Sequence, residues 1–467
     1  MVESFFNPKS VALIGASHEP KKIGYVILEN LVKDFKGKIY PINPKANDIL
    51  NLKVFPSIKN VEDKIDVAII ATPANTVPSL LKECGEKGVK NIIIISGGFS
   101  EASEEGKKIE EECKKIIKEK KIRVIGPNCL GILDNFSKLN TLFLPSNILE
   151  RPKEGNVSFI SQSGSIASTI IDCFSEEGIG LARFVSYGNA IDVNECDLLD
   201  FFFNDEKTKV ILFFLEGVRN GKRFIKIARK VSKKKPIIAL KGGKTYSGIK
   251  AALSHTASLA GEYKIYSSIF KQVGIIEAEN LEEMLDFAKA FSKQPLPRGK
   301  NVVIISAGGG LGVITSDECE KYELYLPEVD ENIKSKLKEI LPSYAIIKNP
   351  IDLTGNVTSE TYLITLEECL KSNLFDGAIL ILLFQSPLTD NQQLLEELPI
   401  IIEKYKKPVL CCSPGGKSSK HFRKILEEKN IPTYDTPERA VRSFAAMVRY
   451  VNLNKLKPQK DKSHHPV

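Results

Sequence analysis

The chain has 467 residues, more than one hydrophobic core usually serves, so we expect two or three domains. Apolar residues make up 42% and charged residues 27%, a composition that excludes a disordered or fibrous protein. The net charge of +8 is mild for this length, and lysines alternate with glutamates along stretches such as "GKKIEEECKKIIKEKKIR". This pattern indicates solvated helix faces and suits acidic small ligands at least as readily as nucleic acid, which is not expected as a partner.

The cysteines and the apolar runs indicate the cellular compartment. None of the nine cysteines forms a CxxC or a Cys/His cluster of zinc spacing, so they are expected to be reduced core thiols, with no metal site. We find neither a signal peptide nor an apolar run of about 18 residues, and therefore expect no membrane association. These features together predict a cytoplasmic protein.

The first third alternates short apolar runs with small-residue turns and amphipathic helices, the pattern of a parallel sheet with crossover helices. The expected strands are "SVALIGA" (10–16), "KIYPINP" (38–44), "VAIIATP" (67–73), "NIIIISGG" (91–98) and "IRVIGPN" (122–128). Each ends in a turn of the kind that holds ligands in a doubly wound sheet. We predict a Rossmann-like domain over residues 1–150, closed by a linker at "PSNILERPKEG".

The same pattern recurs twice, which predicts an α/β chain of three doubly wound modules, the second and third flavodoxin-like. The second series is "NVSFISQSG", "ARFVSYGN", "KVILFFLEG" and "PIIALKGG", and the third is "NVVIISAGGG", "ELYLP", "AILILLF" and "KPVLCCS". Because "SKQPLPRGK" has two prolines and no apolar periodicity, we place domains at 151–292 and 300–455. Residues 456–467 are polar and are predicted to be a disordered tail.

The turn after the first strand, "VALIGASHEPKKIG", resembles a phosphate-binding helix start. It is not GxGxxG, so a nicotinamide site is only weakly indicated. The second strand ends at "INPK", where an NAD site usually places an acidic residue, yet Lys45 stands there. A lysine at this position favours a ribose phosphate, as in NADP or coenzyme A, and a solvated lysine after a turn is the plain alternative.

The second module opens with "VSFISQSGSIAST", which places Ser161, Gln162, Ser163, Gly164 and Ser165 at a helix start. Hydroxyl groups and unpaired N–H groups there form a natural anion site, and a well-capped helix explains the stretch equally well. A serine hydrolase is disfavoured, because its nucleophile turn needs Gly-x-Ser-x-Gly.

Glu216 ends the run "KVILFFLEGV", which is apolar enough to be buried on both faces. A buried carboxylate needs a donor, and the ring of His255 would supply one while its second nitrogen acts as a nucleophile. Backbone amides at the sheet rim are the alternative partners. His255 lies in the run "SHTASLAG", whose small side chains leave little bulk to hold a loop rigid. We therefore expect a mobile loop that could carry a nucleophile between two sites. Walker A is excluded, since Ile238 stands where its first glycine belongs.

These motifs, in this order, resemble the alpha subunits of archaeal ADP-forming acetyl-CoA synthetases, in the nucleoside-diphosphate-forming acyl-CoA synthetase superfamily that includes succinyl-CoA synthetase. The stretches that carry the resemblance are "SVALIGAS", "PINPK", "ATPA", "GPNCLG", "SQSG", "SYGNAIDVNECDLL", "LEGVR", "SHTASLAG", "SAGGGLGV" and "NPIDLTG". The resemblance implies that acyl-CoA and phosphate give CoA and an acyl phosphate, whose phosphoryl group passes to His255 and then to ADP. It also implies that Glu216 steadies the phosphohistidine.

The resemblance assigns further residues. The first domain would bind coenzyme A through Gly15, Ala16, Ser17, Lys22, Gly24, Asn43, Pro44, Lys45, Thr72, Pro73, Ala74, Ser96, Gly97, Gly98 and Asn128. Phosphate would lie at Ser161, Gln162, Ser163 and Gly164 and at Gly308, Gly309 and Gly310, and the acyl group near Asn189 and Asp192. Ala257 stands where the family commonly has glycine, which puts the ease of loop movement in doubt.

The family needs an ATP-grasp domain, and nothing in this sequence resembles one. The resemblance therefore implies a beta subunit that binds ADP or ATP with Mg²⁺, in a heterotetramer of two alpha and two beta chains. Two other functions are open: a non-catalytic sensor of CoA or nucleotides, and an NADP-dependent oxidoreductase, which Lys45 alone supports. Neither of them needs the Glu216 and His255 pair.

Overall fold

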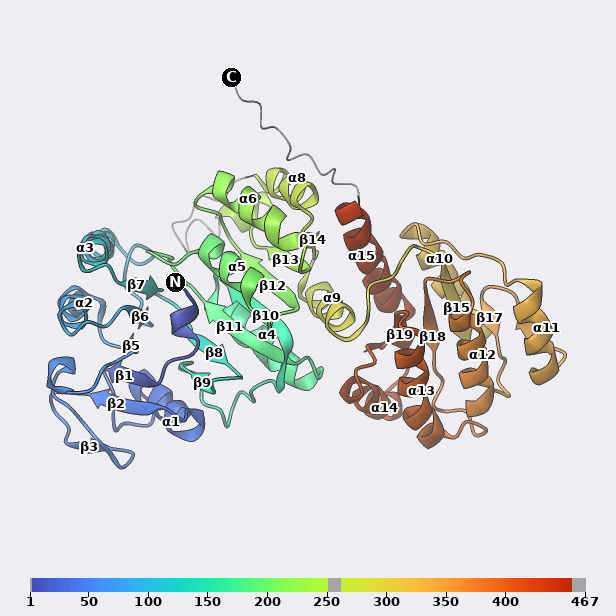
Figure 1. Ribbon diagram of the computed structural model, residues 1–467, viewed down its shortest axis with the longest axis horizontal. Helices are drawn as coiled ribbons and strands as arrows, with labels where there is room; N and C mark the ends of the chain where they lie inside the picture. The colour runs from blue at the N-terminus through green and yellow to red at the C-terminus, as the bar shows by residue number, and fades with distance from the viewer. Residues whose placement is uncertain (1, 251–261, 456–467) are drawn as a thin grey trace, which may run out of the picture. The chain divides into compact units, whose positions relative to one another are not determined.

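The computed structural model describes residues 2–250 and 262–455 (Figure 1). The chain divides into two compact units, Met1–Glu279 and Asn280–Val467. The segment 251–261, which contains His255, and the expected tail 456–467 lie outside the described residues. No described helix is long and apolar enough to cross a membrane.

The first sheet has five parallel strands in the order β2-β1-β5-β6-β7. The strands are β1 (Ser10–Ile14), β2 (Lys38–Ile42), β5 (Val67–Ile70), β6 (Asn91–Ile94) and β7 (Arg123–Ile125), and the helices are α1 (Ile23–Asp34), α2 (Val77–Glu86) and α3 (Glu104–Lys120). Side chains alternate along a strand. Accordingly, Val11 and Leu13 share a core with α1, whereas Ala12 and Ile14 pack with α2 and α3.

Short elements complete this region. They are the hairpin of β3 (Asp48–Ile49) and β4 (Leu52–Lys53) and the 3₁₀ helices η1 (Val2–Phe5), η2 (Ile58–Asn60) and η3 (Ala74–Thr76).

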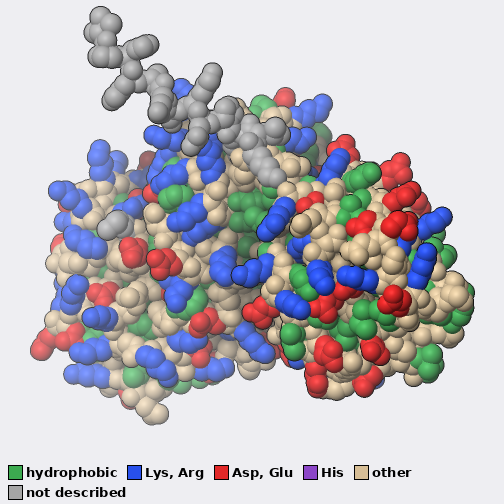
Figure 2. Space-filling view, turned by 45° about the vertical axis from the view of Figure 1, so that its right-hand side comes forward, with side chains coloured by type: hydrophobic (Ala, Val, Ile, Leu, Met, Phe, Trp, Pro, Cys, Tyr) green, Lys and Arg blue, Asp and Glu red, His purple; other side chains and the backbone are tan. Residues whose placement is uncertain are grey.

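On the face drawn in Figure 2, Lys and Arg side chains are interspersed with Asp and Glu. This mixed surface agrees with the solvated helix faces expected from the sequence.

The second sheet has the order β14-β13-β12-β10-β11-β8-β9. Its strands are β8 (Ile132–Asp134), β9 (Leu139–Asn140), β10 (Glu154–Ser161), β11 (Leu181–Ser186), β12 (Val210–Leu215), β13 (Ile237–Lys241) and β14 (Ile276–Glu277), with helices α4 (Gly164–Glu176), α5 (Glu195–Asn204), α6 (Gly221–Ser232) and α8 (Tyr263–Val273). Strands β8 and β9 run antiparallel and extend this sheet from within residues 1–150.

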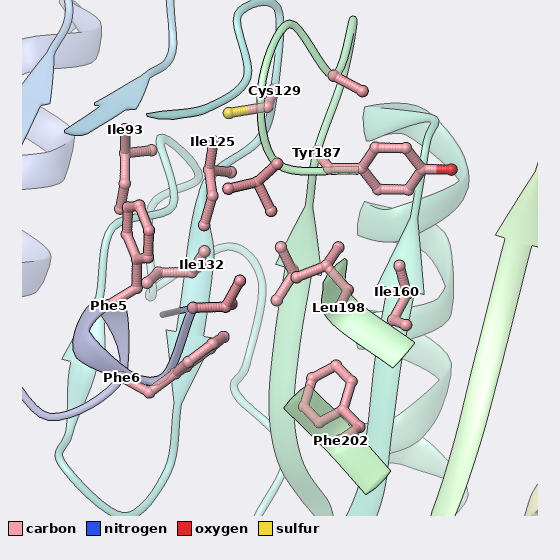
Figure 3. Close-up of a cluster of buried hydrophobic side chains, with 14 of the residues drawn as sticks. Phe5, Phe6, Ile93, Ile125, Cys129, Ile132, Ile160, Tyr187, Leu198 and Phe202 are labelled. Atoms are coloured by element: carbon pink, nitrogen blue, oxygen red, sulfur yellow. The ribbon is translucent and has the colours of Figure 1, made fainter. Parts of the chain in front are cut away.

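One hydrophobic core joins the two sheets of this unit. Ile93 and Ile125 of the first sheet lie in the same buried cluster as Ile132, Ile160 and Leu198 (Figure 3). The side chains of η1 complete the cluster, and its Phe5 is fully buried. Shared burial of this kind fixes the carboxyl ends of both sheets as parts of one packed body.

The second unit has a six-stranded sheet in the order β16-β17-β15-β18-β19-β20. Its elements are α9 (Leu281–Lys293), β15 (Val302–Ser306), α10 (Gly309–Lys321), α11 (Glu331–Ile340), β16 (Ile346–Ile347), β17 (Ile351–Asp352), α12 (Ser359–Lys371), β18 (Gly377–Ile381), α13 (Asn391–Tyr405), β19 (Val409–Cys412), α14 (Lys417–Glu428), β20 (Thr433–Tyr434) and α15 (Pro437–Lys455). The α/β class with three modules is confirmed.

The prediction of a strand at "ELYLP" is wrong. This stretch makes only an isolated bridge, between Tyr325 and Asn301. The place beside β15 belongs to β17 instead, with Ile351 opposite Ile305. Pro327 has no N–H to continue a ladder, which is consistent with a single bridge.

Candidate active site

The turns assigned to coenzyme A lie along one edge of the first sheet, because the carboxyl ends of parallel strands meet there. Direct contacts connect them: Asn43 Nδ2 donates to Ala16 O at 2.7 Å, Ser96 Oγ donates to Thr72 O, and Asn128 N donates to Ser96 O at 2.8 Å. These bonds connect the turns after β1 and β2 and, as a second group, the turns after β5, β6 and β7.

Two glycines make the first of these turns possible. Gly15 has φ +94°, and a Cβ there would lie 2.6 Å from Ala71 O. A Cβ on Gly24 would lie 1.9 Å from Gly15 O, so the start of α1 packs directly on the turn. No side-chain hydrogen bond caps the N-terminus of α1. Its first N–H groups, which no helical carbonyl can reach, suit an anionic ligand.

Two assigned lysines are on the surface beside this edge. Lys22 forms an ion pair with Glu19 at 2.6 Å, and both side chains are exposed. Lys45 is also exposed, and its backbone N–H donates to Asn43 Oδ1 at 2.8 Å. Neither lysine is held by the core, so each can turn toward a ligand.

The serine-rich turn after β10 is ordered by its own hydrogen bonds. Ser161 Oγ donates to Ser163 O at 2.7 Å, and Ser163 Oγ accepts from Ile166 N at 3.4 Å as the N-cap of α4. Helix capping, the plain interpretation of this stretch, is therefore present. The cap satisfies only one of the N-terminal N–H groups, so it does not exclude an anion site.

Gln162 connects this turn to Glu216. Its Oε1 accepts from Glu216 N at 2.8 Å, from Gly217 N at 3.2 Å and from Tyr187 OH at 3.4 Å. Two backbone donors fix which end of the amide is oxygen, and the Nε2 group therefore points away from the loop. Glu216 itself is 9% exposed, and its Oε2 has no hydrogen-bond partner among the described residues.

Tyr187 serves this contact as a neutral donor. Burial raises its pKa well above the ordinary value, and the nearby carboxylates of Glu195 and Glu216 raise it further. The hydroxyl consequently keeps its proton and can donate it to Gln162. In Figure 3 this hydroxyl points away from the labelled aliphatic side chains. Sequence reasoning missed Tyr187, although it stands within the "SYGN" strand end.

Asn189 and Asp192, which the resemblance assigns to the acyl group, lie at different places in the structure. The Asn189 amide donates to Glu101 Oε2 at 2.6 Å and to Glu110 Oε2 at 3.2 Å, and it accepts from Asn128 Nδ2 at 3.3 Å. It thereby ties the "SYGN" turn to the edge of the first sheet. Asp192 instead accepts from Arg123 Nε and Val124 N, both at 2.8 Å, at the amino end of β7.

In the second unit, Gly308 is the N-cap of α10 and has no side-chain cap. Ser306 Oγ accepts from its N–H at 3.1 Å. A Cβ on Gly309 would lie 2.9 Å from Asp352 Oδ2, whereas one on Gly310 would meet nothing within 4 Å. The predicted glycine turn is thus present with one open position, and it has a carboxylate beside it.

A cavity of about 740 Å³ lies elsewhere in the first unit. Its lining includes Arg123, Asp134, Arg183 and Lys207, at the amino ends of β7 and β12. Arg183 lies close to the rings of Phe6, Phe136 and Phe201 and pairs with buried acids, so its charge is satisfied internally. The cavity is at the opposite edge from the serine turn and plays no part in the site.

Family models match most of the chain in three parts. They are described as a CoA binding domain (residues 9–135), a succinyl-CoA ligase like flavodoxin domain (154–291) and a Ligase-CoA domain (302–451). The alpha subunit of ADP-forming acetate–CoA ligase II from Pyrococcus furiosus is 41% identical, over 96% of this chain and 98% of that protein. The chain belongs to the ADP-forming acetate–CoA ligase family. The resemblance inferred from the motifs is confirmed.

Other members of the ligase family differ in length. The ADP-forming acetate–CoA ligase of Methanocaldococcus jannaschii is 43% identical, and this chain spans 64% of it. Among solved structures, acetyl-coenzyme A synthetase 1 of Ca. Korarchaeum cryptofilum, in complex with phosphate and ADP, has a TM-score of 0.92 at 37% identity. That match covers 97% of this chain and 98% of the solved one.

Proposed function

We propose that the chain is the alpha-type subunit of an ADP-forming acid–thiol ligase, which converts acyl-CoA, ADP and phosphate reversibly to acid, CoA and ATP. The observation that carries the proposal is the bond network of Gln162, which holds the Glu216 loop against the serine-rich start of α4. A buried acid thereby meets a helix N-terminus suited to phosphate. The family members named above support this function over a non-catalytic sensor.

The reaction proceeds in three substitutions. A phosphate oxygen attacks the thioester carbon, the C–S bond breaks, and the CoA thiolate leaves and takes up a proton. A ring nitrogen of His255 then attacks phosphorus, and the P–O bond breaks so that its electron pair leaves with the carboxylate. Finally an oxygen of ADP attacks phosphorus and the P–N bond breaks. Throughout these steps, Glu216 would accept a hydrogen bond from the N–H of the other ring nitrogen. This bond would stabilise the positive charge on the ring.

The proposed binding roles for CoA, phosphate and the acyl group fall on different modules. The turns after β1, β2, β5, β6 and β7 would hold CoA. The start of α4 and the glycine turn of α10 are each a candidate for binding phosphate. Asn189 and Asp192 are kept as candidates for the acyl side. Asn189 has the better position, since it borders the candidate CoA edge through Asn128.

A partner would complete the enzyme. Two relatives that align with 96% of this chain are named as alpha subunits. We therefore infer an ATP-grasp beta subunit that binds ADP with Mg²⁺, in a heterotetramer of two alpha and two beta chains in the cytoplasm. The magnesium ion would offset the negative charge of the diphosphate and would be bound by the partner subunit.

The test is to purify the chain with an ATP-grasp partner and measure ATP formation from ADP, phosphate and a panel of acyl-CoAs. Acetyl-CoA and 4-hydroxybutyryl-CoA come first, because both acids occur in the names of relatives. His255→Asn is expected to abolish ATP formation and acid-labile labelling from radioactive ATP. His421→Asn, at an exposed position of α14, serves as the matched control. Labelling that persists in His255→Asn contradicts the proposal.

A further inference from the structure

Lys241 is a buried lysine at the carboxyl edge of the second sheet. It is the last residue of β13 and pairs with Leu215, the last residue of β12, so it stands beside the strand end that leads into Glu216. Its side chain is only 1% exposed. A lysine is almost never buried to this degree without a paired charge or a specific purpose.

The direct contacts of this lysine are a backbone carbonyl and an aromatic ring. Its Nζ donates to Gly242 O and lies 4.8 Å from the centre of the Tyr266 ring. Within the described part of the chain it forms no ion pair. By contrast, buried Lys289 lies 3.4 Å from a carboxylate oxygen of Glu427.

Both groups that contact the ammonium also contact the Glu216 loop. A Cβ on Gly242 would lie 3.5 Å from Glu216 Cγ, so the peptide that accepts from Lys241 packs against the Glu216 side chain. Tyr266 OH accepts from Val218 N at 3.1 Å. Burial lowers the pKa of Lys241, while the Glu216 carboxylate raises it, as expected of charges that share a poorly solvated space.

Glu216 needs such a cation. Its Oε2 is buried and has no hydrogen-bond partner among the described residues. A carboxylate in this position is costly without compensating charge, and a phosphoryl group beside it would add more negative charge.

We propose that Lys241 is a positioning residue of the phosphorylation site, whose buried ammonium balances the charge of the Glu216 carboxylate and of the phosphoryl group beside it. This inference rests on the phosphohistidine function proposed above. It adds to that function an internal cation, supplied by β13, beside the serine-rich start of α4.

The experiment compares three variants of the full chain with its ATP-grasp partner, by the rate of acid-labile labelling from radioactive ATP. Lys241→Met is expected to slow labelling by about 10- to 100-fold, by analogy with the loss of partners that orient metal ligands. When ATP formation from acetyl-CoA, ADP and phosphate is measured, the loss should fall on kcat and leave KM for acetyl-CoA unchanged, because the candidate CoA residues lie on the other sheet. Lys241→Arg keeps the charge and should recover most of the rate.

Lys235→Met is the matched control. Lys235 lies just before the amino end of the same strand, is 7% exposed and donates to Phe202 O and Asp205 O, far along β13 from Glu216. It should label at the wild-type rate. Wild-type labelling in Lys241→Met, or equal losses in Lys235→Met and Lys241→Met, overturns the inference alone. Absence of label in the wild-type complex overturns the proposed function and this inference with it.

Discussion

Gln162 holds the loop that carries Glu216, because its side-chain oxygen receives two backbone N–H groups of that loop. We predict that Gln162→Ala slows phosphorylation of the complex by about 10- to 100-fold, since the carboxylate loses its fixed position. CoA affinity should not change, because the candidate CoA turns are on the other sheet. Rapid-quench labelling and calorimetric titration with CoA measure the two quantities.

Gln162→Glu separates position from charge. Its carboxylate oxygens can still accept from the same donors, so the thermal midpoint should stay near that of the wild type. The added negative charge beside Glu216 should nevertheless slow labelling, because like charges in a poorly solvated site repel. Labelling at the wild-type rate in both variants means that Gln162 does not position the acid.

Single residues were predictable where the signal is local. The run "KVILFFLEGV" predicts a buried Glu216, and the structure confirms it, since Glu216 is 9% exposed and follows a strand whose residues are all buried. The bond from Gln162 to Glu216 was not predictable, since it joins residues 54 positions apart through a side-chain rotamer. Lys241 had a signal in the sequence, a lysine that ends the apolar run "PIIAL", and only its neighbours reveal its environment.

At the scale of helices and strands, apolar runs predict all strands of the first sheet and the central strands of the other two, since parallel strands are buried on both faces. They do not predict the short strands β8, β9, β14, β16, β17 and β20. The pattern fails for "ELYLP", where apolar residues pack without a ladder, and it cannot indicate that β8 and β9 run antiparallel. Strand direction depends on which partner is nearby in the fold, and no local run of residues encodes that.

A buried ion pair contributes to the packing of α9 against α15. Arg439 donates to both carboxylate oxygens of Asp286, at 2.6 and 2.8 Å, and Asp286 is 1% exposed. Arg439→Met leaves that carboxylate buried and unpaired, which should lower the free energy of unfolding by about 3–5 kcal/mol. Urea unfolding of the second unit, followed by hydrogen exchange, measures the loss.

The loss should depend on pH. Burial raises the pKa of Asp286 and Arg439 lowers it, so the carboxyl of the variant binds its proton more readily in the folded protein. A raised acid pKa gives stability that is present at low pH and lost as pH rises through the folded pKa. The deficit should therefore be smaller at about pH 5 than at about pH 8. Asp286→Asn combined with Arg439→Met should recover much of it, and a pH-independent deficit contradicts this account.

For the molecule as a whole, the order of motifs predicted the family, and relatives aligned over nearly the full length confirm it. The division of the described chain after Glu279 was not predictable, because the pairing of α9 with α15 joins residues 153 positions apart. The approach of His255 to Glu216 stays a prediction, because 251–261 lie outside the described residues.

All nine cysteines are unpaired, and they report on the folding of every module at once. Burial raises the pKa of Cys84, Cys129 and Cys319 to about 12, and only Cys173 is partly exposed. Because the thiolate is the reactive form, the native chain should react with a disulfide reagent near neutral pH first and mainly at Cys173. Cys173→Ser should remove that phase, while unfolding in urea should release the remaining eight thiols. Fast reaction of several thiols in native Cys173→Ser, counted by mass spectrometry, would contradict this burial in solution.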